Sequence, residues 1–134
     1  MNKKVKAVTL TEVLIVMAII GIFLLIAFPN LAPLVTKAKS TEAKMQLEHM
    51  YRLQDAHFLE YSKYSDNFQK LGFIQEDLVT EKENGHANYR IEIIEASVTG
   101  FKATATAVVD FNKDGNFNTW EINEENNLKE TVPD

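Results

Sequence analysis

The feature that most constrains this chain is an unbroken run of apolar residues near its start, VLIVMAIIGIFLLIAF, over residues 13–28. The run is about 16 residues long, or about 21 from Val8, and a helix needs roughly 20 to cross a bilayer. Lys3, Lys4 and Lys6 precede it. Because basic residues keep a flank in the cytoplasm, we expect a single-pass protein with a cytoplasmic N-terminus and an exported remainder.

The position of a possible cleavage site is unusual. A conventional signal peptide carries its small-residue cleavage site after the apolar block. Here the small residue at the junction of the basic and apolar segments is Ala7, before the block, and the residues after Phe28 read PNLAP, with no convincing site. Cleavage after Ala7 would remove the basic leader and leave the apolar segment attached as an anchor.

Glu12 stands at the beginning of this anchor. A carboxylate at membrane depth costs roughly 2.5–3.5 kcal/mol on insertion scales, so it normally has a partner. One interpretation is that Glu12 lies at the interface and reaches the lipid headgroups. The other is that a second protein group pairs with it.

Residues 3–29 resemble the prepilin processing motif of type IV pilins and type II secretion pseudopilins. In that family a short basic leader ends at a small residue, usually Gly, and cleavage exposes a residue, usually Phe, that becomes N-methylated. The fifth mature residue is Glu, and a Gly and a Pro soften the helix. The resemblance implies cleavage between Ala7 and Val8 and N-methylation of Val8. It also implies that Glu12 is the carboxylate used in assembly and that Gly21 and Pro29 soften the helix. Ala7 in place of Gly and Val8 in place of Phe depart from the usual pattern.

The chemistry of the motif is consistent with assembly. Cleavage before Val8 creates an α-amino group, which is cationic at neutral pH. In a stack of such helices this ammonium can pair with Glu12 of a neighbour, so that each buried charge has a partner. Methylation keeps the charge.

The remainder of the chain predicts an α+β fold, with a long N-terminal helix packed on a small antiparallel sheet. The helix is transmembrane in its first half and amphipathic in its second. We expect a basic leader at 1–7, a transmembrane and assembly helix at 8–34, and a globular head at 35–134. The head divides into an amphipathic helix at 35–61, a connecting region at 62–87, and the sheet with an Asp/Asn loop at 88–134. Apolar residues at spacings of three and four form the stripe that faces the sheet: Ala38, Ala43, Leu47, Met50, Tyr51, Gln54, Phe58 and Tyr61.

Strand patterns follow the connecting region. Residues 89–93 and 101–107 alternate, and residues 97–100, SVTG, supply a turn between them. This predicts two antiparallel strands, and a third over residues 120–122.

Residues 110–121, DFNKDGNFNTWE, match the calcium-loop pattern D-x-[DN]-x-[DN]-G-x5-E. Gly115 allows the sharp turn that brings oxygen ligands together around a hard cation. The expected Ca²⁺ ligands are the side chains of Asp110, Asn112, Asp114, Asn118 and Glu121 and the carbonyl of Asn116. Since strands flank it, the loop would resemble an EF-hand loop without being an EF-hand. The alternative is an Asx-rich turn that satisfies its own backbone and binds no ion.

Composition excludes several other classes. The formal net charge is −5, which argues against a general nucleic-acid binder, because such proteins need a basic face. The chain has no cysteine, so disulfides and thiolate metal sites are excluded. It also lacks a nucleophile elbow, a phosphate loop and a dinucleotide fingerprint, so we expect no enzyme.

The predicted function is that of a structural subunit of a type IV pilus-like filament, either a pilin of a fimbrium or a pseudopilin in protein secretion. It would be processed by prepilin peptidase and polymerised from the bacterial inner membrane into a periplasmic or extracellular filament. Its partners would be copies of itself, other pilins, the peptidase/methyltransferase and the assembly platform. The absence of a cysteine pair and the calcium-type loop favour the secretion branch. The alternative is a membrane-anchored, monomeric calcium-binding module.

Overall fold

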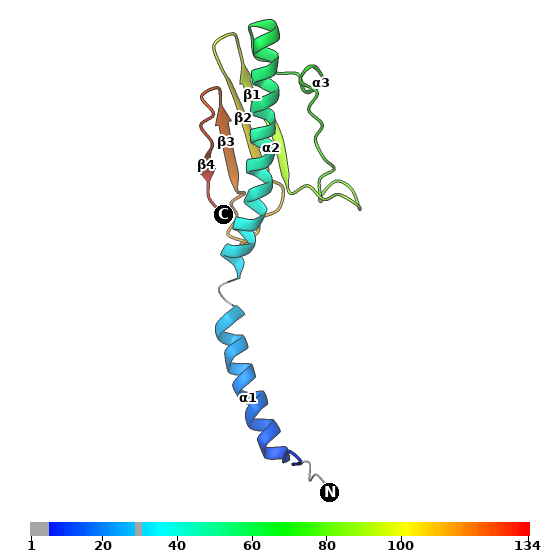
Figure 1. Cartoon of the computed structure of the whole chain (residues 1–134), viewed down its shortest axis with the longest axis vertical. Helices are drawn as coiled ribbons and strands as arrows, with labels where there is room; N and C mark the ends of the chain where they lie inside the picture. The colour runs from blue at the N-terminus through cyan, green and yellow to red at the C-terminus, as the bar shows by residue number, and fades with distance from the viewer. Residues whose placement is uncertain (1–5, 29–30) are drawn as a thin grey trace, which may run out of the picture. The chain divides into compact units, whose positions relative to one another are not determined.

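The computed structural model describes residues 6–28 and 31–134, and the chain divides into two compact units, Met1–Ala32 and Pro33–Asp134. The α+β class predicted from the sequence is confirmed: an apolar N-terminal helix is followed by a helix that packs on an antiparallel sheet (Figure 1). Pro29, a predicted softening position, lies outside the described residues.

The first unit contains one helix, α1, over Leu10–Ala27. Thr9 is its N-cap and Phe28 its C-cap. None of its residues is buried within the chain. Among the described residues, α1 is the one helix that is long and apolar enough to cross a membrane.

The helix α2, Ala32–Tyr61, lies in the second unit except for its first residue. Pro33 is tolerated there because the first turn of a helix has no intrahelical partner for its N–H groups. The helix ends where Ser62 takes a left-handed conformation (φ 55°) and donates its N–H to the carbonyl of Phe58 at 2.7 Å. Four members of the predicted stripe are buried, Ala43, Leu47, Met50 and Gln54, whereas Ala38 and Tyr61 are exposed.

Four strands form one antiparallel sheet in the order β1-β2-β3-β4. They are β1 Tyr89–Ala96, β2 Phe101–Ala107, β3 Thr119–Asn123 and β4 Lys129–Val132. The sequence predicted the first three and missed β4. All four residues of β4 are exposed and two of them are charged, so the strand lacks the alternation that marks a half-buried strand.

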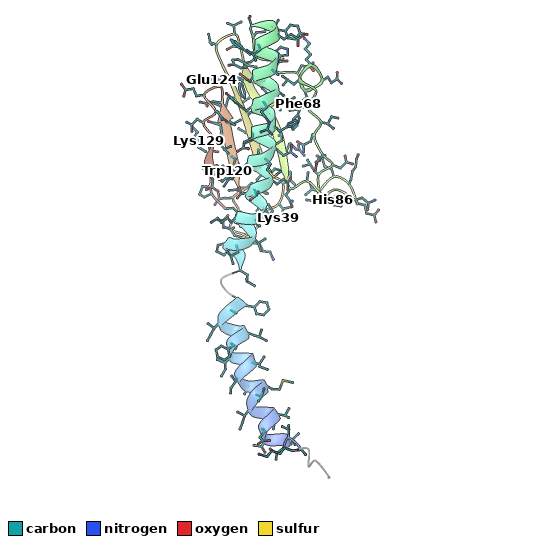
Figure 2. All side chains as sticks on the ribbon, in the orientation of Figure 1. Lys39, Phe68, His86, Trp120, Glu124 and Lys129 are labelled. Carbon is teal, nitrogen blue, oxygen red and sulfur yellow. The ribbon has the colours of Figure 1, made fainter. Side chains whose placement is uncertain are left out.

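The core lies between α2 and the sheet. Alternate residues of the central strand β2 face the helix, and three of them are alanines, Ala103, Ala105 and Ala107. Small side chains there leave room for Leu47 and Met50 of α2, both fully buried. Lys44, also on α2, places its ammonium 4.4 Å from the ring centroid of Trp120 on β3 (labelled in Figure 2), a cation–π contact.

The connecting segment between α2 and β1 includes a short helix, α3, Phe68–Leu71, which Asn67 caps at its start and Gly72 ends in a left-handed conformation. Further along, the side chain of Gln75 accepts from the N–H of Ile91 at 2.8 Å and donates to the carbonyl of Tyr89 at 3.2 Å. These bonds occupy backbone groups at the outer edge of β1 that would otherwise be open to another strand.

Candidate functional site

The first turn of α1 holds Glu12 in a capping box. The backbone N–H of Thr9 donates to Oε2 of Glu12 at 2.9 Å, and the hydroxyl oxygen of Thr9 accepts from the N–H of Glu12 at 3.3 Å. This arrangement satisfies two donors of the helix terminus at once. Glu12 therefore has a partner within its own chain. The T-x-x-E spacing of Thr9 and Glu12 is the signal of this box in the sequence.

Ala7 and Val8, the predicted cleavage pair, are exposed and lie outside any helix or strand. Gly21 lies inside the continuous helix α1, and a Cβ atom built on it would meet nothing within 4 Å. No side chain of its own chain therefore requires a glycine at this position. Processing, methylation and helix softening stay predictions.

The Asp/Asn loop connects β2 to β3 and is held by successive Asx turns. Asp110 accepts from the N–H of Lys113 at 2.6 Å and from the N–H of Gly115 at 2.7 Å. Asn112 accepts from the N–H of Asp114 at 2.8 Å, and Asp114 from the N–H of Asn116 at 2.8 Å. Gly115 has φ 90°, which favours glycine. Hydrogen bonds of this kind form in Asx turns without an ion.

Hydrogen bonds within the loop favour the ionised form of Asp114. The hydrogen bond from the N–H of Asn116, with a second one from the side-chain amide of Asn112, lowers the pKa of Asp114 below its usual value. Asp114 is exposed, so its carboxylate is accessible from solvent.

Two of the predicted ligands have other partners. Asn118 is fully buried, and its Oδ1 accepts from the hydroxyl of Tyr89 at 2.7 Å and from the indole N–H of Trp120 at 2.9 Å. Its amide nitrogen donates to Oε1 of Glu130 at 2.6 Å and to the carbonyl of Val132 at 3.0 Å. All the hydrogen-bonding groups of this side chain are thus engaged inside the fold.

Glu121 lies within β3, where it pairs in register with Lys129 of β4. The Nζ of Lys129 lies 3.2 Å from Oε1 of Glu121. Its neighbour in sequence, Ile122, is buried against the helix, so Glu121 projects from the opposite face of the sheet. The structure gives Glu121 a role in joining the two strands.

A third aspartate, which the sequence pattern did not indicate, lies beside the loop. One carboxylate oxygen from each of Asp110, Asp114 and Asp134 lies within 4.8 Å of the other two. Asp134 follows β4, and no local spacing rule relates it to a loop more than a dozen residues earlier. Only the pairing of β4 with β3 brings the two segments together.

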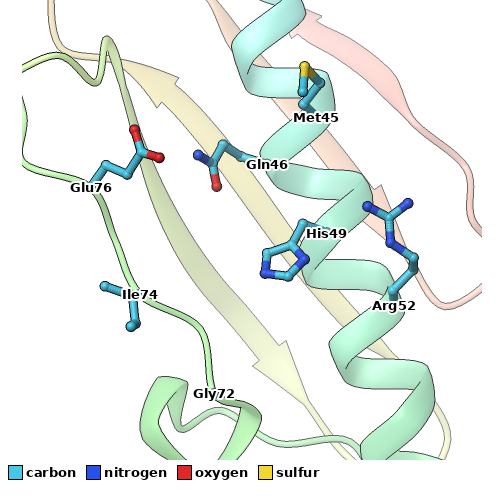
Figure 3. A pocket seen from close by; sticks show the side chains of 7 residues that line it. All are labelled: Met45, Gln46, His49, Arg52, Gly72, Ile74 and Glu76. Carbon is cyan, nitrogen blue, oxygen red and sulfur yellow. The ribbon is translucent and has the colours of Figure 1, made fainter.

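A separate open hollow of about 420 Å³ lies between α2 and the connecting segment (Figure 3). His49, Arg52 and Met45 line it from α2, and Ile74 and Glu76 from the opposite side. The ring of His49 packs against Phe73, with centroids 5.9 Å apart. The histidine thus contacts an aromatic ring, and within the described residues no hydrogen bond joins it to an acid or a nucleophile.

Comparison with known proteins identifies two similarities. Residues 2–28 match the family model described as the prokaryotic N-terminal methylation motif. The chain is 40% identical over 75 residues to the type IV major pilin protein PilA of Myxococcus xanthus (strain DK1622). That alignment covers 56% of this chain and 34% of the relative, so the chain spans about a third of the relative's length.

The aligned stretch is longer than the motif, so part of the similarity lies outside residues 2–28. The motif and the apolar helix α1 together indicate a membrane-anchored, single-pass protein. In its N-terminal motif and in the aligned stretch, the chain is similar to type IV pilins.

Proposed function

We propose that this chain is a structural subunit of a type IV pilus-like filament, cleaved by prepilin peptidase between Ala7 and Val8 and polymerised from the inner membrane with copies of itself. The observation that carries the proposal is the surface of α1. Beyond Glu12 the helix is apolar all round, and none of its residues is buried within the chain. An apolar helix of this kind needs lipid before assembly and neighbouring helices after it.

The branch of the family is part of the proposal. The absence of cysteine and the Asp/Asn loop favour a secretion pseudopilin. The relative, however, is a type IV major pilin. We therefore favour a pilus subunit, with a pseudopilin as the alternative. In either role the subunit is structural.

We also propose that the Asp/Asn loop binds Ca²⁺. Supporting this are the match to the calcium-loop pattern and the cluster of carboxylate oxygens that includes Asp110 and Asp114. Hard cations such as Ca²⁺ prefer oxygen ligands of this kind. Asn118 and Glu121 are not part of the proposed site, because each has other partners.

Glu12 provides the test of assembly, because it has two separable properties. Its carboxylate accepts the Thr9 N–H in the capping box, and its charge can pair with the Val8 ammonium of a neighbour. Gln at this position preserves the capping box but removes the charge. Glu12→Gln should therefore leave membrane insertion and processing intact and reduce filament yield about tenfold or more, since an ammonium would be buried unpaired.

The measurement is the amount of subunit in sheared filaments and in membranes, in cells that supply the assembly machinery. Glu12→Ala, which loses both properties, is the companion variant. Wild-type yield from Glu12→Gln would refute charge pairing and leave capping as the role of Glu12. A wild-type chain that stays monomeric beside an active assembly machinery would favour the monomeric calcium-binding module.

A further inference from the structure

Asp134 lies where three segments of the second unit meet. It follows β4, and its Oδ2 accepts a 2.9 Å hydrogen bond from the hydroxyl of Thr36, near the start of α2. Its carboxylate is also part of the cluster with Asp110 and Asp114 of the β2–β3 loop. The Asp134 carboxylate is therefore bonded to the helix and lies within 4.8 Å of carboxylate oxygens of the candidate calcium loop.

The second oxygen of this carboxylate is anomalous. Oδ1 of Asp134 is buried and has no hydrogen-bond partner among the described residues. A buried polar atom without a partner costs about 1–3 kcal/mol, and more when the group is charged. Native proteins rarely accept such a cost unless a water or an ion satisfies the atom.

The surroundings of the cluster are consistent with a cation. Within the part of the chain that the structure describes, no lysine or arginine lies at ion-pair distance from Asp110, Asp114 or Asp134. Three carboxylates so close together repel one another, and a divalent cation converts that repulsion into attraction. Ca²⁺ binds oxygens at 2.3–2.6 Å, so two ligands of one ion lie at most about 5 Å apart. The separations of up to 4.8 Å in the cluster meet this limit.

We propose that Asp134 is a ligand of the calcium site and that bound Ca²⁺ fastens the residues after β4, and through Thr36 the start of α2, to the β2–β3 loop. This inference rests on the calcium site of the proposed function and adds to it a ligand outside the loop. Bound Ca²⁺ would act as a latch, since it joins segments that are 98 positions apart in the chain. Without the ion, repulsion among the carboxylates would weaken the contact of β4 with the loop.

The test uses the full-length chain in detergent, with Ca²⁺ binding measured by calorimetry and unfolding followed by the fluorescence of the single tryptophan, Trp120. The variants are Asp134→Asn, Asp110→Asn and Asp114→Asn, and the matched control is Asp66→Asn, an exposed aspartate of the connecting segment. Asparagine keeps an acceptor for Thr36 and removes only the charge.

Asp134→Asn should weaken Ca²⁺ binding about tenfold or more, as the two loop variants should, and Asp66→Asn should not change it. In EGTA, where no Ca²⁺ is bound, Asp134→Asn should melt at or above the wild-type temperature, because the repulsion among the carboxylates is relieved. A role limited to the Thr36 hydrogen bond would not give a variant that binds Ca²⁺ more weakly and yet melts no lower than the wild type in EGTA.

Wild-type affinity in Asp134→Asn, with binding lost in Asp110→Asn, would overturn the latch and leave the loop site intact. No binding of Ca²⁺ to the wild-type chain would overturn both. Neither result bears on filament assembly, which the Glu12 variants test separately.

Discussion

The hydroxyl of Tyr89, at the start of β1, donates a 2.7 Å hydrogen bond to Oδ1 of Asn118, just before β3, and both side chains are fully buried. Because Asn118 also bonds Trp120, Glu130 and the carbonyl of Val132, it joins three strands at one end of the sheet. The residue that the sequence assigned to calcium is thus a structural centre of the fold.

Asn118→Ala should lower the stability of the second unit by about 3 kcal/mol, because it leaves several buried groups without partners. The loss should be as large in EGTA as in Ca²⁺, measured by thermal unfolding of the full chain in detergent. Asn84→Ala, at an exposed position, is the control. A destabilisation seen only in Ca²⁺ would instead support Asn118 as a calcium ligand.

Glu42 connects α2 to the beginning of β1. Its carboxylate accepts from the N–H of Asn88 at 2.7 Å, from the Asn88 side-chain amide at 2.7 Å and from the N–H of Tyr89 at 3.3 Å. Glu42→Ala should cost about 2 kcal/mol of stability in denaturant unfolding, since hydrogen bonds to a charged group are the stronger kind. Glu48→Ala, on the exposed side of the same helix, should stay within about 0.5 kcal/mol. Equal effects of the two substitutions would contradict this role.

Alkaline pH should destabilise the second unit through Tyr89. Burial, assisted by the negative charges of Glu42, Asp134 and Glu130, raises the pKa of Tyr89 above its usual value near 10. The folded state then holds the phenol proton more tightly than the unfolded state. Stabilisation from this group is complete below pH 10 and is lost as the pH rises further, by up to about 1.4 kcal/mol per pH unit.

Unfolding curves between pH 8 and pH 11.5 test this expectation. Tyr89→Phe should be less stable at pH 8, because the bond to Asn118 is lost, but its stability should fall less steeply above pH 10. Some slope will remain, since burial also raises the pKa of Tyr64. If Tyr89→Phe declines as steeply as the wild type, Tyr89 does not titrate in this way.

Gly21 should be a soft position of α1. Glycine costs a helix about 1 kcal/mol relative to alanine, and the space around Gly21 is open. Gly21→Ala should therefore slow hydrogen exchange of the amides at 22–28 about fivefold in detergent, and Ala18→Gly should accelerate it. Unchanged exchange in both variants would refute the expectation. In a filament, we expect the backbone between residues 21 and 29 to lengthen or unwind.

Processing should yield a mature chain that begins with N-methylated Val8. The exposed, non-helical conformation of Ala7 and Val8 suits recognition by a peptidase. Intact-mass and N-terminal analysis of filaments should find residues 1–7 absent. Retention of the leader in assembled filaments, or cleavage after Ala27, would contradict the assignment.

The sequence by itself determined the elements that local signals encode. An uncharged apolar run beyond Glu12 can only be covered by lipid or other apolar helices, and spacings of three and four identify the face of α2 that holds Leu47 and Met50. Alternation identified β1 and β2 because each buries one face. The Asx turns of residues 110–116 were also predictable, since they form within a few residues.

Only the tertiary structure decided the contacts between distant segments. β4 pairs with β3 through backbone hydrogen bonds, which leave no pattern in its exposed side chains. That pairing places Glu130 and Val132 against Asn118, and Asp134 against the loop and Thr36. A spacing motif lists residues that can reach a common point, but which of them do so depends on strand register and on competing buried partners. For this reason the motif could not show that Asn118 and Glu121 have partners within the sheet, or that Asp134 lies beside the loop.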